Sequence, residues 1–156
     1  MKRVLVIEDR DDLRAVFAAT LVVGGYSVRG ARDGREGIVM VLAEHPDLIL
    51  CDINMPGMDG YRTLEAIRKC PGTADIPFIM MTGSTVHSEF RRAMNCGADD
   101  YLAKPFAPSQ LLAAVKTRLE RHAGPQREVA QRDSQPAEAE TWFCLHESAM
   151  PVTHAA

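Results

Sequence analysis

Several short apolar runs in this chain end in residues whose side chains can take part in chemistry. Glu8 and Asp9 follow the first such run, and Asp52 ends the third. Thr82 ends the fourth run, and Lys104 follows the fifth. Together they supply three carboxylates, one hydroxyl and one ammonium group. Such a set could bind a hard metal ion and an anion such as phosphate, provided that the fold brings the residues together.

The pattern of the chain predicts that these residues meet. Apolar runs of strand length alternate with stretches of helical periodicity, which favours an α/β fold with a parallel sheet between helices. The expected strands are residues 4–7, 26–31, 47–52, 76–82 and 101–103, and the expected helices are residues 11–23, 34–43, 61–69, 86–95 and 109–121. Ligands of open parallel sheets bind at the carboxyl ends of the strands, where the five polar side chains would converge.

The charges of this cluster indicate which chemistry it could perform. Its three carboxylates and one ammonium group sum to two negative charges, which would repel one another without a divalent cation. Carboxylate oxygens suit Mg²⁺. Asp52 is then a candidate nucleophile that forms an aspartyl-phosphate. Lys104 and the metal ion could neutralise the phosphoryl oxygens, and the Thr82 hydroxyl could donate to one of them.

Four runs of this sequence resemble the receiver domain of two-component response regulators, and the chain is similar to the single-domain regulators of chemotaxis. The runs are residues 6–9 (VIED), 50–60 (LCDINMPGMDG), 81–83 (MTG) and 97–106 (GADDYLAKPF). The likeness covers about residues 2–121. It implies a flavodoxin-like, doubly wound fold, with five parallel strands in the order 2-1-3-4-5 and five helices.

The resemblance also implies a phosphoryl acceptor and a metal site. Asp52 stands where the family carries its phospho-acceptor. Glu8 and Asp9 stand at the acidic metal pair, where the family often has two aspartates and Glu8 is a common variant. Asp52 and the backbone carbonyl of Asn54 would complete the protein ligands of Mg²⁺.

Three further positions take their roles from the same resemblance. Lys104 would contact the phosphoryl group, and its peptide bond to Pro105 is expected to be cis. Thr82 and Tyr101 would form a switch pair, in which the hydroxyl of Thr82 moves toward the phosphoryl group and frees space for the Tyr101 ring.

Each of these residues also has a structural alternative. Asp52 could cap a turn, and the acidic pair after the first strand could cap the helix that begins near Asp11. Thr82 could be an ordinary strand residue, Lys104 a solvated charge and Tyr101 a core residue. Their coincidence at four strand ends, in the family's order, favours the functional interpretation.

Hydropathy and cysteine spacing indicate where in the cell the protein is found. No apolar run approaches the ~20 residues that span a bilayer, and acidic residues interrupt the apolar start too early for a signal peptide. A cytoplasmic protein without membrane contact is therefore expected. The four cysteines form no C-x-x-C pair, so reduced thiols are expected.

Charge is distributed unevenly along the chain. Residues 1–121 hold 16 basic and 16 acidic residues, whereas residues 122–156 hold 2 and 5, so the net charge of −3 lies in the tail. A neutral body and an acidic tail lack the basic surface of a nucleic-acid-binding protein. We expect no direct contact with nucleic acid.

The expected function is a signalling switch. By resemblance, a sensor histidine kinase or a histidine phosphotransfer protein phosphorylates it, and an unknown output protein binds the face of the fourth helix, fifth strand and fifth helix. The chain would take part in its own phosphotransfer and autodephosphorylation without being a conventional enzyme. Alternatives are a phosphorelay intermediate or phosphate sink, a degenerate scaffold, and a Mg²⁺-dependent aspartyl-phosphate hydrolase. Such hydrolases usually carry an aspartate where this chain has Asn54.

Two segments follow from these patterns: a receiver domain at residues 1–121 and a linker-like tail at residues 122–156. The stretch 123–140 is poor in apolar residues and is expected to be disordered in part. An apolar segment at residues 142–150 could dock on the receiver, bind a partner or be inert. No output domain is recognisable after residue 121, because 35 residues of this composition cannot form one.

Overall fold

Strands and helices alternate along the part of the chain that the computed structural model describes, residues 1–83 and 87–123. The strands are β1 (Arg3–Ile7), β2 (Ser27–Ala31), β3 (Leu48–Asp52), β4 (Phe78–Thr82) and β5 (Asp100–Ala103). The helices are α1 (Asp11–Val23), α2 (Gly34–Glu44), α3 (Gly60–Lys69), α4 (His87–Asn95) and α5 (Pro108–His122). Every predicted element is present, with ends shifted by two residues at most.

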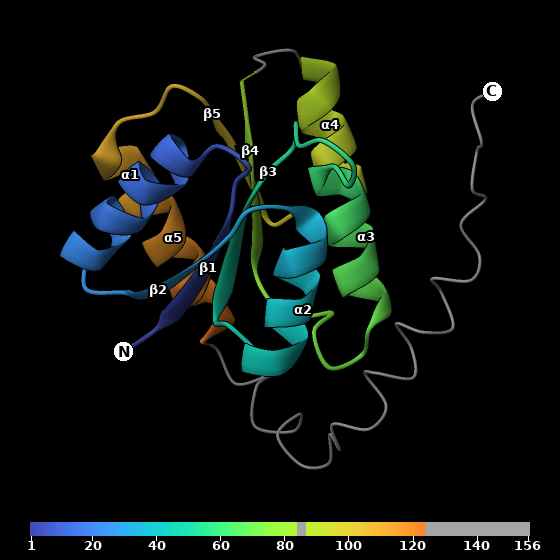
Figure 1. Cartoon of the computed structure of the whole chain (residues 1–156), viewed down its shortest axis with the longest axis horizontal. Coiled ribbons are helices and arrows are strands. Elements are labelled where there is room, and N and C mark those ends of the chain that lie inside the picture. The colour runs from blue at the N-terminus through green and yellow to red at the C-terminus, as the bar shows by residue number, and fades with distance from the viewer. Residues whose placement is uncertain (84–86, 124–156) are drawn as a thin grey trace.

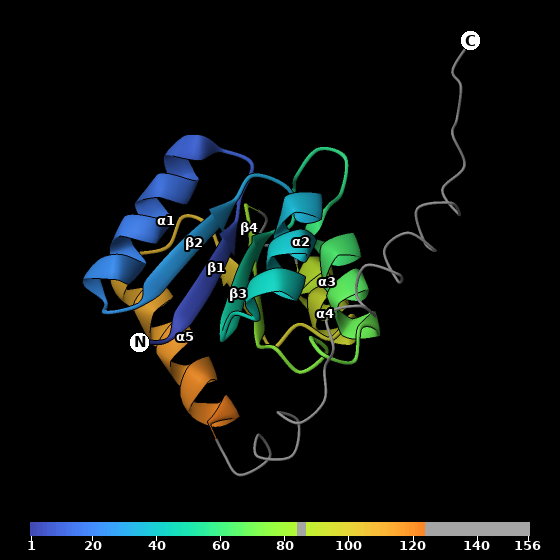
Figure 2. The same cartoon turned by 60° about the horizontal axis from the view of Figure 1, so that its bottom comes forward.

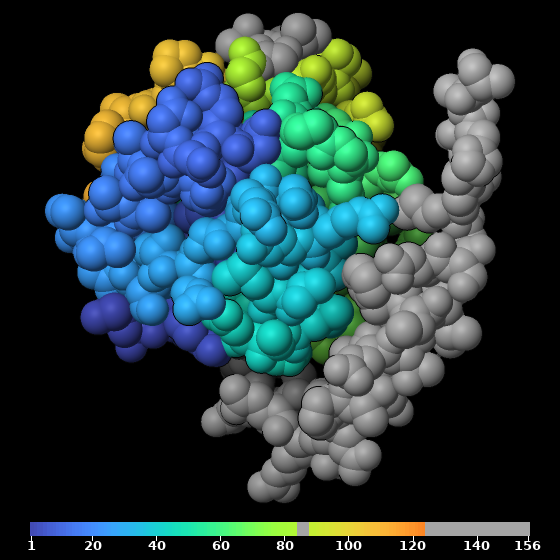
Figure 3. All heavy atoms as spheres, viewed as in Figure 1, coloured from blue at the N-terminus to red at the C-terminus, as the bar shows by residue number. Residues whose placement is uncertain are grey.

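All strand pairs are parallel, and the sheet order is β2-β1-β3-β4-β5. Helices α1 and α5 cover one face, while α2, α3 and α4 cover the other (Figure 1). The view in Figure 2 follows β2, β1 and β3 side by side across the sheet. In the space-filling view, α1, α2 and α3 cover most of the visible surface (Figure 3). The flavodoxin-like α/β fold expected from the sequence is confirmed.

The two faces of the sheet have separate hydrophobic cores. Along β1, Val4 and Val6 pack on the side of α1 and α5, whereas Leu5 and Ile7 pack on the side of α2 and α3. Successive strand residues point to opposite faces, so a strand between two helical layers must be apolar at every position. The central strand β3 follows this rule from Leu48 to Cys51, and its last residue, Asp52, is a buried carboxylate at the edge of the sheet.

Helix α1 shows where the periodicity of the sequence was insufficient. Phe17 and Leu21 are buried, but Val16 is 57% exposed and Val23 is 87% exposed. The second half of this helix is apolar on nearly every side, so its sequence could not indicate which side faces the sheet.

No helix within residues 1–83 and 87–123 is long and apolar enough to cross a membrane. Three thiols in this part of the chain, those of Cys51, Cys70 and Cys96, are free. Helix α5 ends at His122, and residues 124–156 lie outside the described residues. The predictions for the tail, including its apolar segment 142–150, therefore stay predictions.

Candidate functional site

The parallel sheet brings the predicted residues to one edge, at the carboxyl ends of its strands. Glu8 follows β1, and Asp52 and Thr82 are the last residues of β3 and β4. Lys104 follows β5, and its backbone N–H donates to the carbonyl of Thr82 at 2.6 Å. The backbone N–H of Ile53, just after Asp52, donates to the carbonyl of Met81 at 2.9 Å. Ladder hydrogen bonds thus fix the positions from which the site side chains project.

Lys104 lies at the centre of this cluster. Its Nζ is 2.6 Å from Oε2 of Glu8 and 2.9 Å from Oδ1 of Asp52. The side chains are largely buried, with exposed fractions of 17% for Lys104, 1% for Glu8 and 6% for Asp52. One cation therefore bridges two carboxylates with little access of water, and water screens such interactions much less than it screens surface ion pairs.

The environment of this cluster shifts the pKa values of two members. Burial raises the pKa of the Glu8 carboxyl, and the negative charge of Asp52 adds to that shift, while Lys104 opposes it. Burial alone would lower the pKa of Lys104, but its contacts with Glu8 and Asp52 outweigh burial and raise it. Lys104 is consequently held in its charged form.

Three carboxylates lie close enough together to hold a metal ion. One oxygen each from Glu8, Asp9 and Asp52 lies within 4.8 Å of the others, and Asp9 is the member accessible to solvent. Carboxylate oxygens at this spacing fit a hard divalent cation such as Mg²⁺. Asn54 follows Asp52 by two residues and is exposed; the role of its carbonyl as a further ligand stays a prediction.

The capping alternatives are not observed at these carboxylates. Helix α1 starts after Arg10, whose side chain makes no capping hydrogen bond, and the contact of Glu8 with this end of the helix is a long 3.3 Å bond from the N–H of Arg10. The carboxylate of Asp52 faces Lys104. The helix cap in the loop after β3 is Asp59, which accepts a 2.8 Å bond from the N–H of Arg62. Helix capping therefore does not occupy the carboxylates of Glu8 and Asp52, which instead pair with Lys104.

Gly60 allows the loop after β3 to approach the strand end closely. Its N–H donates to the carbonyl of Ile53 at 2.9 Å. A Cβ atom at this position would lie only 2.5 Å from the carbonyl oxygen of Asp52 and 2.9 Å from the Cα of Ile53. The absence of a side chain here thus sets how tightly α3 packs behind Asp52.

Aromatic rings support Lys104 from the side of α1. Its Nζ lies 5.8 Å from the centroid of the Phe17 ring, and Phe17 stacks on Phe106 with centroids 5.1 Å apart. The peptide bond between Lys104 and Pro105 is cis, as expected from the resemblance. The segment after β5 is therefore anchored both at the sheet edge and against α1.

A family model described as "Response regulator receiver domain" matches residues 4–116. The chain belongs to this family. Phosphorylation and Mg²⁺ binding are typical of such receiver domains in two-component systems.

Known relatives of this receiver domain include regulators of transcription and chemotaxis proteins. A probable transcriptional regulator ycf27 of Porphyridium aerugineum is 37% identical over 120 residues, which are 77% of this chain and 49% of that protein. The DNA-binding dual master transcriptional regulator RpaA of Synechocystis is 36% identical over 121 residues, 78% of this chain and 50% of that protein. The chain thus spans about half the length of the curated relatives it matches.

Among solved structures, the chemotaxis protein CheY4 of Vibrio cholerae superposes with a TM-score of 0.73 at 32% identity, covering 76% of this chain and 98% of that one. A putative response regulator from Chloroflexus aurantiacus gives 0.74 at 35% identity, covering 77% and 98%. The similarity to chemotaxis-type receivers is confirmed at the level of the fold.

The predicted switch pair of the receiver lies on β4 and β5. Thr82 is buried, and it pairs in register with Ala103. Tyr101, two residues before Ala103, is half-buried on the same face of the sheet, and its ring meets that of Phe90 edge to face at 5.7 Å. Both residues thus face α4, and their role as a switch stays a prediction.

Sequence reasoning missed the residue of α4 that contacts this pair. The hydroxyl of Thr82 donates to Oε2 of Glu89 at 3.3 Å. A glutamate in the first turn of a helix is common for reasons of helix stability, so its position in the sequence gave no sign of this contact.

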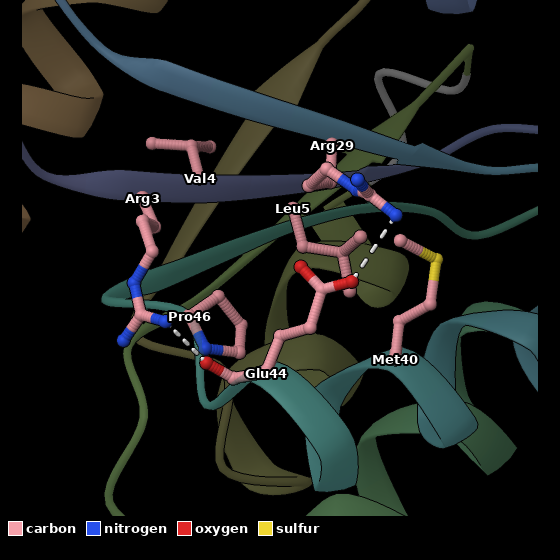
Figure 4. Close-up of a pocket in the computed structure, with 7 residues that line it drawn as sticks. All are labelled: Arg3, Val4, Leu5, Arg29, Met40, Glu44 and Pro46. Carbon is pink, nitrogen blue, oxygen red and sulfur yellow. Dashed lines mark hydrogen bonds and ion pairs between the residues drawn. The ribbon is translucent and has the colours of Figure 1, made fainter.

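A small pocket elsewhere in the receiver offers no second site. Its lining residues surround the start of β1 and the end of α2, and Figure 4 shows them: Arg3, Val4, Leu5, Arg29, Met40, Glu44 and Pro46. The space measures about 10 Å³, at the lower limit for one water molecule. Two of the lining residues, Arg29 and Glu44, form an ion pair at 3.2 Å.

Proposed function

We propose that this receiver accepts a phosphoryl group on Asp52 and thereby switches its affinity for an output protein. The donor would be a sensor histidine kinase or a histidine phosphotransfer protein. Lys104 carries this proposal, because its ammonium group lies 2.9 Å from the carboxylate of Asp52 and is held there by Glu8. A buried cation at that place is positioned to neutralise charge on a phosphoryl group during transfer.

An oxygen of the Asp52 carboxylate would attack the phosphorus of a phosphohistidine. The bond to the imidazole nitrogen breaks as the bond to Asp52 forms, and the imidazole leaves with the electron pair. Lys104 would turn from the carboxylate to an oxygen of the transferred group. Glu8 stays within reach of Lys104 and orients it throughout.

Mg²⁺ would be held by the carboxylates of Glu8, Asp9 and Asp52 and by the carbonyl of Asn54. When bound, it would neutralise phosphoryl oxygens and relieve the repulsion among the carboxylates. Of these ligands, Asp9 is accessible to solvent, so the ion would enter from that side and retain water ligands there.

The face formed by α4, β5 and α5 would bind the output protein. Phe90 and Met94 of α4 are 45% and 39% exposed, and Phe90 packs on Tyr101. On the same face, Arg118 of α5 pairs with Asp100 of β5 at 2.9 Å. Exposed apolar side chains beside the switch pair could transmit a movement of Tyr101 to a partner.

The remaining functional expectations are part of the same proposal. The protein acts in the cytoplasm, and it catalyses its own phosphotransfer and autodephosphorylation without being a conventional enzyme. The neutral charge balance of residues 1–121 supports the absence of direct contact with DNA by this domain. The relatives that regulate transcription are about twice as long, and the DNA binding named for RpaA is not carried over to these residues.

Labelling with acetyl phosphate tests the proposal. Intact-protein mass spectrometry should find one added phosphoryl group in Mg²⁺ and none in EDTA. Asp52→Ala should abolish the label. The matched control Asp75→Ala, which removes an exposed aspartate between α3 and β4, should retain it. Labelling of the Asp52→Ala protein at the normal rate would refute the assignment of the acceptor.

Two further measurements distinguish the alternatives. A phosphorelay intermediate would pass its phosphoryl group to a second histidine protein, whereas a hydrolase would turn over a small phosphate ester many times. Deleting residues 123–156 should leave labelling within about twofold, since every proposed site residue precedes Phe106. A folded truncated protein that cannot be labelled would contradict this separation.

A further inference from the structure

Glu89, in the first turn of α4, contacts the buried hydroxyl at the end of β4. Its Oε2 accepts a 3.3 Å hydrogen bond from Oγ1 of Thr82, which is itself fully buried. A hydroxyl has one proton, so while Thr82 donates to Glu89 it cannot donate to an oxygen of a phosphoryl group on Asp52. The two arrangements of Thr82 exclude each other.

The same turn of α4 is anchored at other points. The backbone carbonyl of Glu89 accepts a 3.3 Å bond from the hydroxyl of Tyr61 on α3. The guanidinium of Arg92 lies 4.1 Å from the centroid of the Tyr61 ring. Phe90 meets Tyr101 edge to face. The position of Glu89 is thus coupled to α3 and to Tyr101, so a change at Thr82 would also affect the contacts of α4 with these two neighbours.

We propose that Glu89 is a positioning residue that holds the Thr82 hydroxyl away from the acceptor site in the unphosphorylated protein. It thereby opposes the change to the signalling state. A carboxylate and a phosphoryl group both carry negative charge, so they compete for one donor and repel each other. This inference rests on the proposed function, because it assigns Glu89 a part in the same switch.

A purely structural role predicts different behaviour. A glutamate in the first turn of a helix interacts favourably with the helix dipole. If that were its only role, replacing it would lower stability and leave the response to a phosphoryl group unchanged. Measurements of the switch, made beside measurements of stability, separate the two roles.

The test uses the full chain with beryllofluoride, a phosphoryl mimic, in Mg²⁺. Glu89→Ala removes the carboxylate to which the Thr82 hydroxyl donates. It should tighten beryllofluoride binding roughly three- to tenfold, the effect of one moderate hydrogen bond on the equilibrium. Glu89→Gln keeps an uncharged hydrogen-bond acceptor, so its affinity for beryllofluoride should lie between those of the wild type and Glu89→Ala. The matched control Glu65→Ala, which removes an exposed glutamate paired with Lys69 on α3, should leave the affinity unchanged.

A double-mutant cycle shows whether the effect passes through Thr82. In a Thr82→Val background there is no hydroxyl to hold, so Glu89→Ala should no longer change the affinity. Equal affinity of wild type and Glu89→Ala, or an undiminished effect in the Thr82→Val background, would overturn the role of Glu89. Failure of the wild type to bind beryllofluoride would instead refute the proposed function.

A readout without metal or phosphoryl mimic completes the test. Fluorine NMR of fluorotyrosine-labelled protein reports on Tyr101 once its signal is assigned by its loss in Tyr101→Phe, so Tyr26 and Tyr61 can stay in place. Glu89→Ala should move its signal toward the position that the beryllofluoride-bound wild type shows, while Glu65→Ala should not. A Tyr101 signal that does not respond to Glu89→Ala would contradict the inference, whatever the outcome of the binding experiment.

Discussion

Replacing Lys104 with methionine should destabilise the protein far more than an ordinary surface substitution. Methionine keeps most of the side-chain volume but leaves the carboxylates of Glu8 and Asp52 facing each other without a cation. Removing one partner of a buried ion pair costs about 3–5 kcal/mol. The Lys104 side chain is 17% exposed, which admits some water, so a loss of about 2–4 kcal/mol is expected at neutral pH in EDTA. In thermal unfolding this corresponds to roughly 10 °C.

Lys116→Met is the matched control. Lys116 pairs with Glu120 at 3.9 Å, and both side chains are about two-thirds exposed, so the pair should contribute less than about 1 kcal/mol. Urea unfolding followed by circular dichroism measures both variants against the wild type. Equal losses in the two variants would refute the conclusion that Lys104 neutralises a buried pair of carboxylates.

Mg²⁺ and pH give independent checks on Lys104→Met. The metal ion supplies the missing positive charge, so it should stabilise this variant more than the wild type. In EDTA, the folded protein holds the Glu8 proton more tightly than the unfolded chain, since burial raises the pKa of Glu8. Stability therefore falls as pH rises through that pKa. Lys104 opposes the shift, so its loss should steepen the fall, and acidification should restore part of the stability.

Three further outcomes are expected. Asp9→Ala should cancel most of the rise in melting temperature that Mg²⁺ produces, and an unchanged rise would remove Asp9 from the ligands. Gly60→Ala should cost about 1–3 kcal/mol and slow acetyl phosphate labelling, because its methyl group would press on the backbone of Asp52 and Ile53. Gly72→Ala, at a position whose nearest neighbour is 3.9 Å away, should be close to neutral in urea unfolding. Burial raises the pKa of the Cys51 thiol well above its usual range, so iodoacetamide at about pH 8 should modify exposed Cys96 and spare Cys51 in the folded protein. Rapid modification of Cys51, detected by peptide mass spectrometry, would contradict its burial.

The electrostatic partners of Lys104 illustrate the limit of sequence reasoning at the site. Its place after a strand predicted that it would reach Asp52, because both follow parallel strands of one sheet. The closer contact, 2.6 Å to Glu8, joins residues 96 positions apart. Which oxygen an ammonium group meets depends on side-chain packing at the sheet edge, and no local pattern encodes that choice.

Arg68 is the centre of a second contact network that the sequence did not predict. Its guanidinium donates to the carbonyls of Ala74 and Ile76, each at 2.8 Å, and to the carboxylate of Asp99 at 2.9 Å. The imidazole of His122 approaches the same carboxylate to 3.5 Å. Such a network forms only after three separate segments have packed together.

The sequence by itself determined the elements, their parallel arrangement and the edge at which Glu8, Asp52, Thr82 and Lys104 meet. Those features follow from local periodicity and from the direction of the chain in β-α units, and both depend on residues that are close together in the sequence. Tertiary structure alone decided which side of α1 faces the sheet, how Lys104 divides its contacts, and that Glu89 reaches Thr82. These features depend on the packing of residues distant in sequence, where differences of an ångström decide whether a hydrogen bond forms.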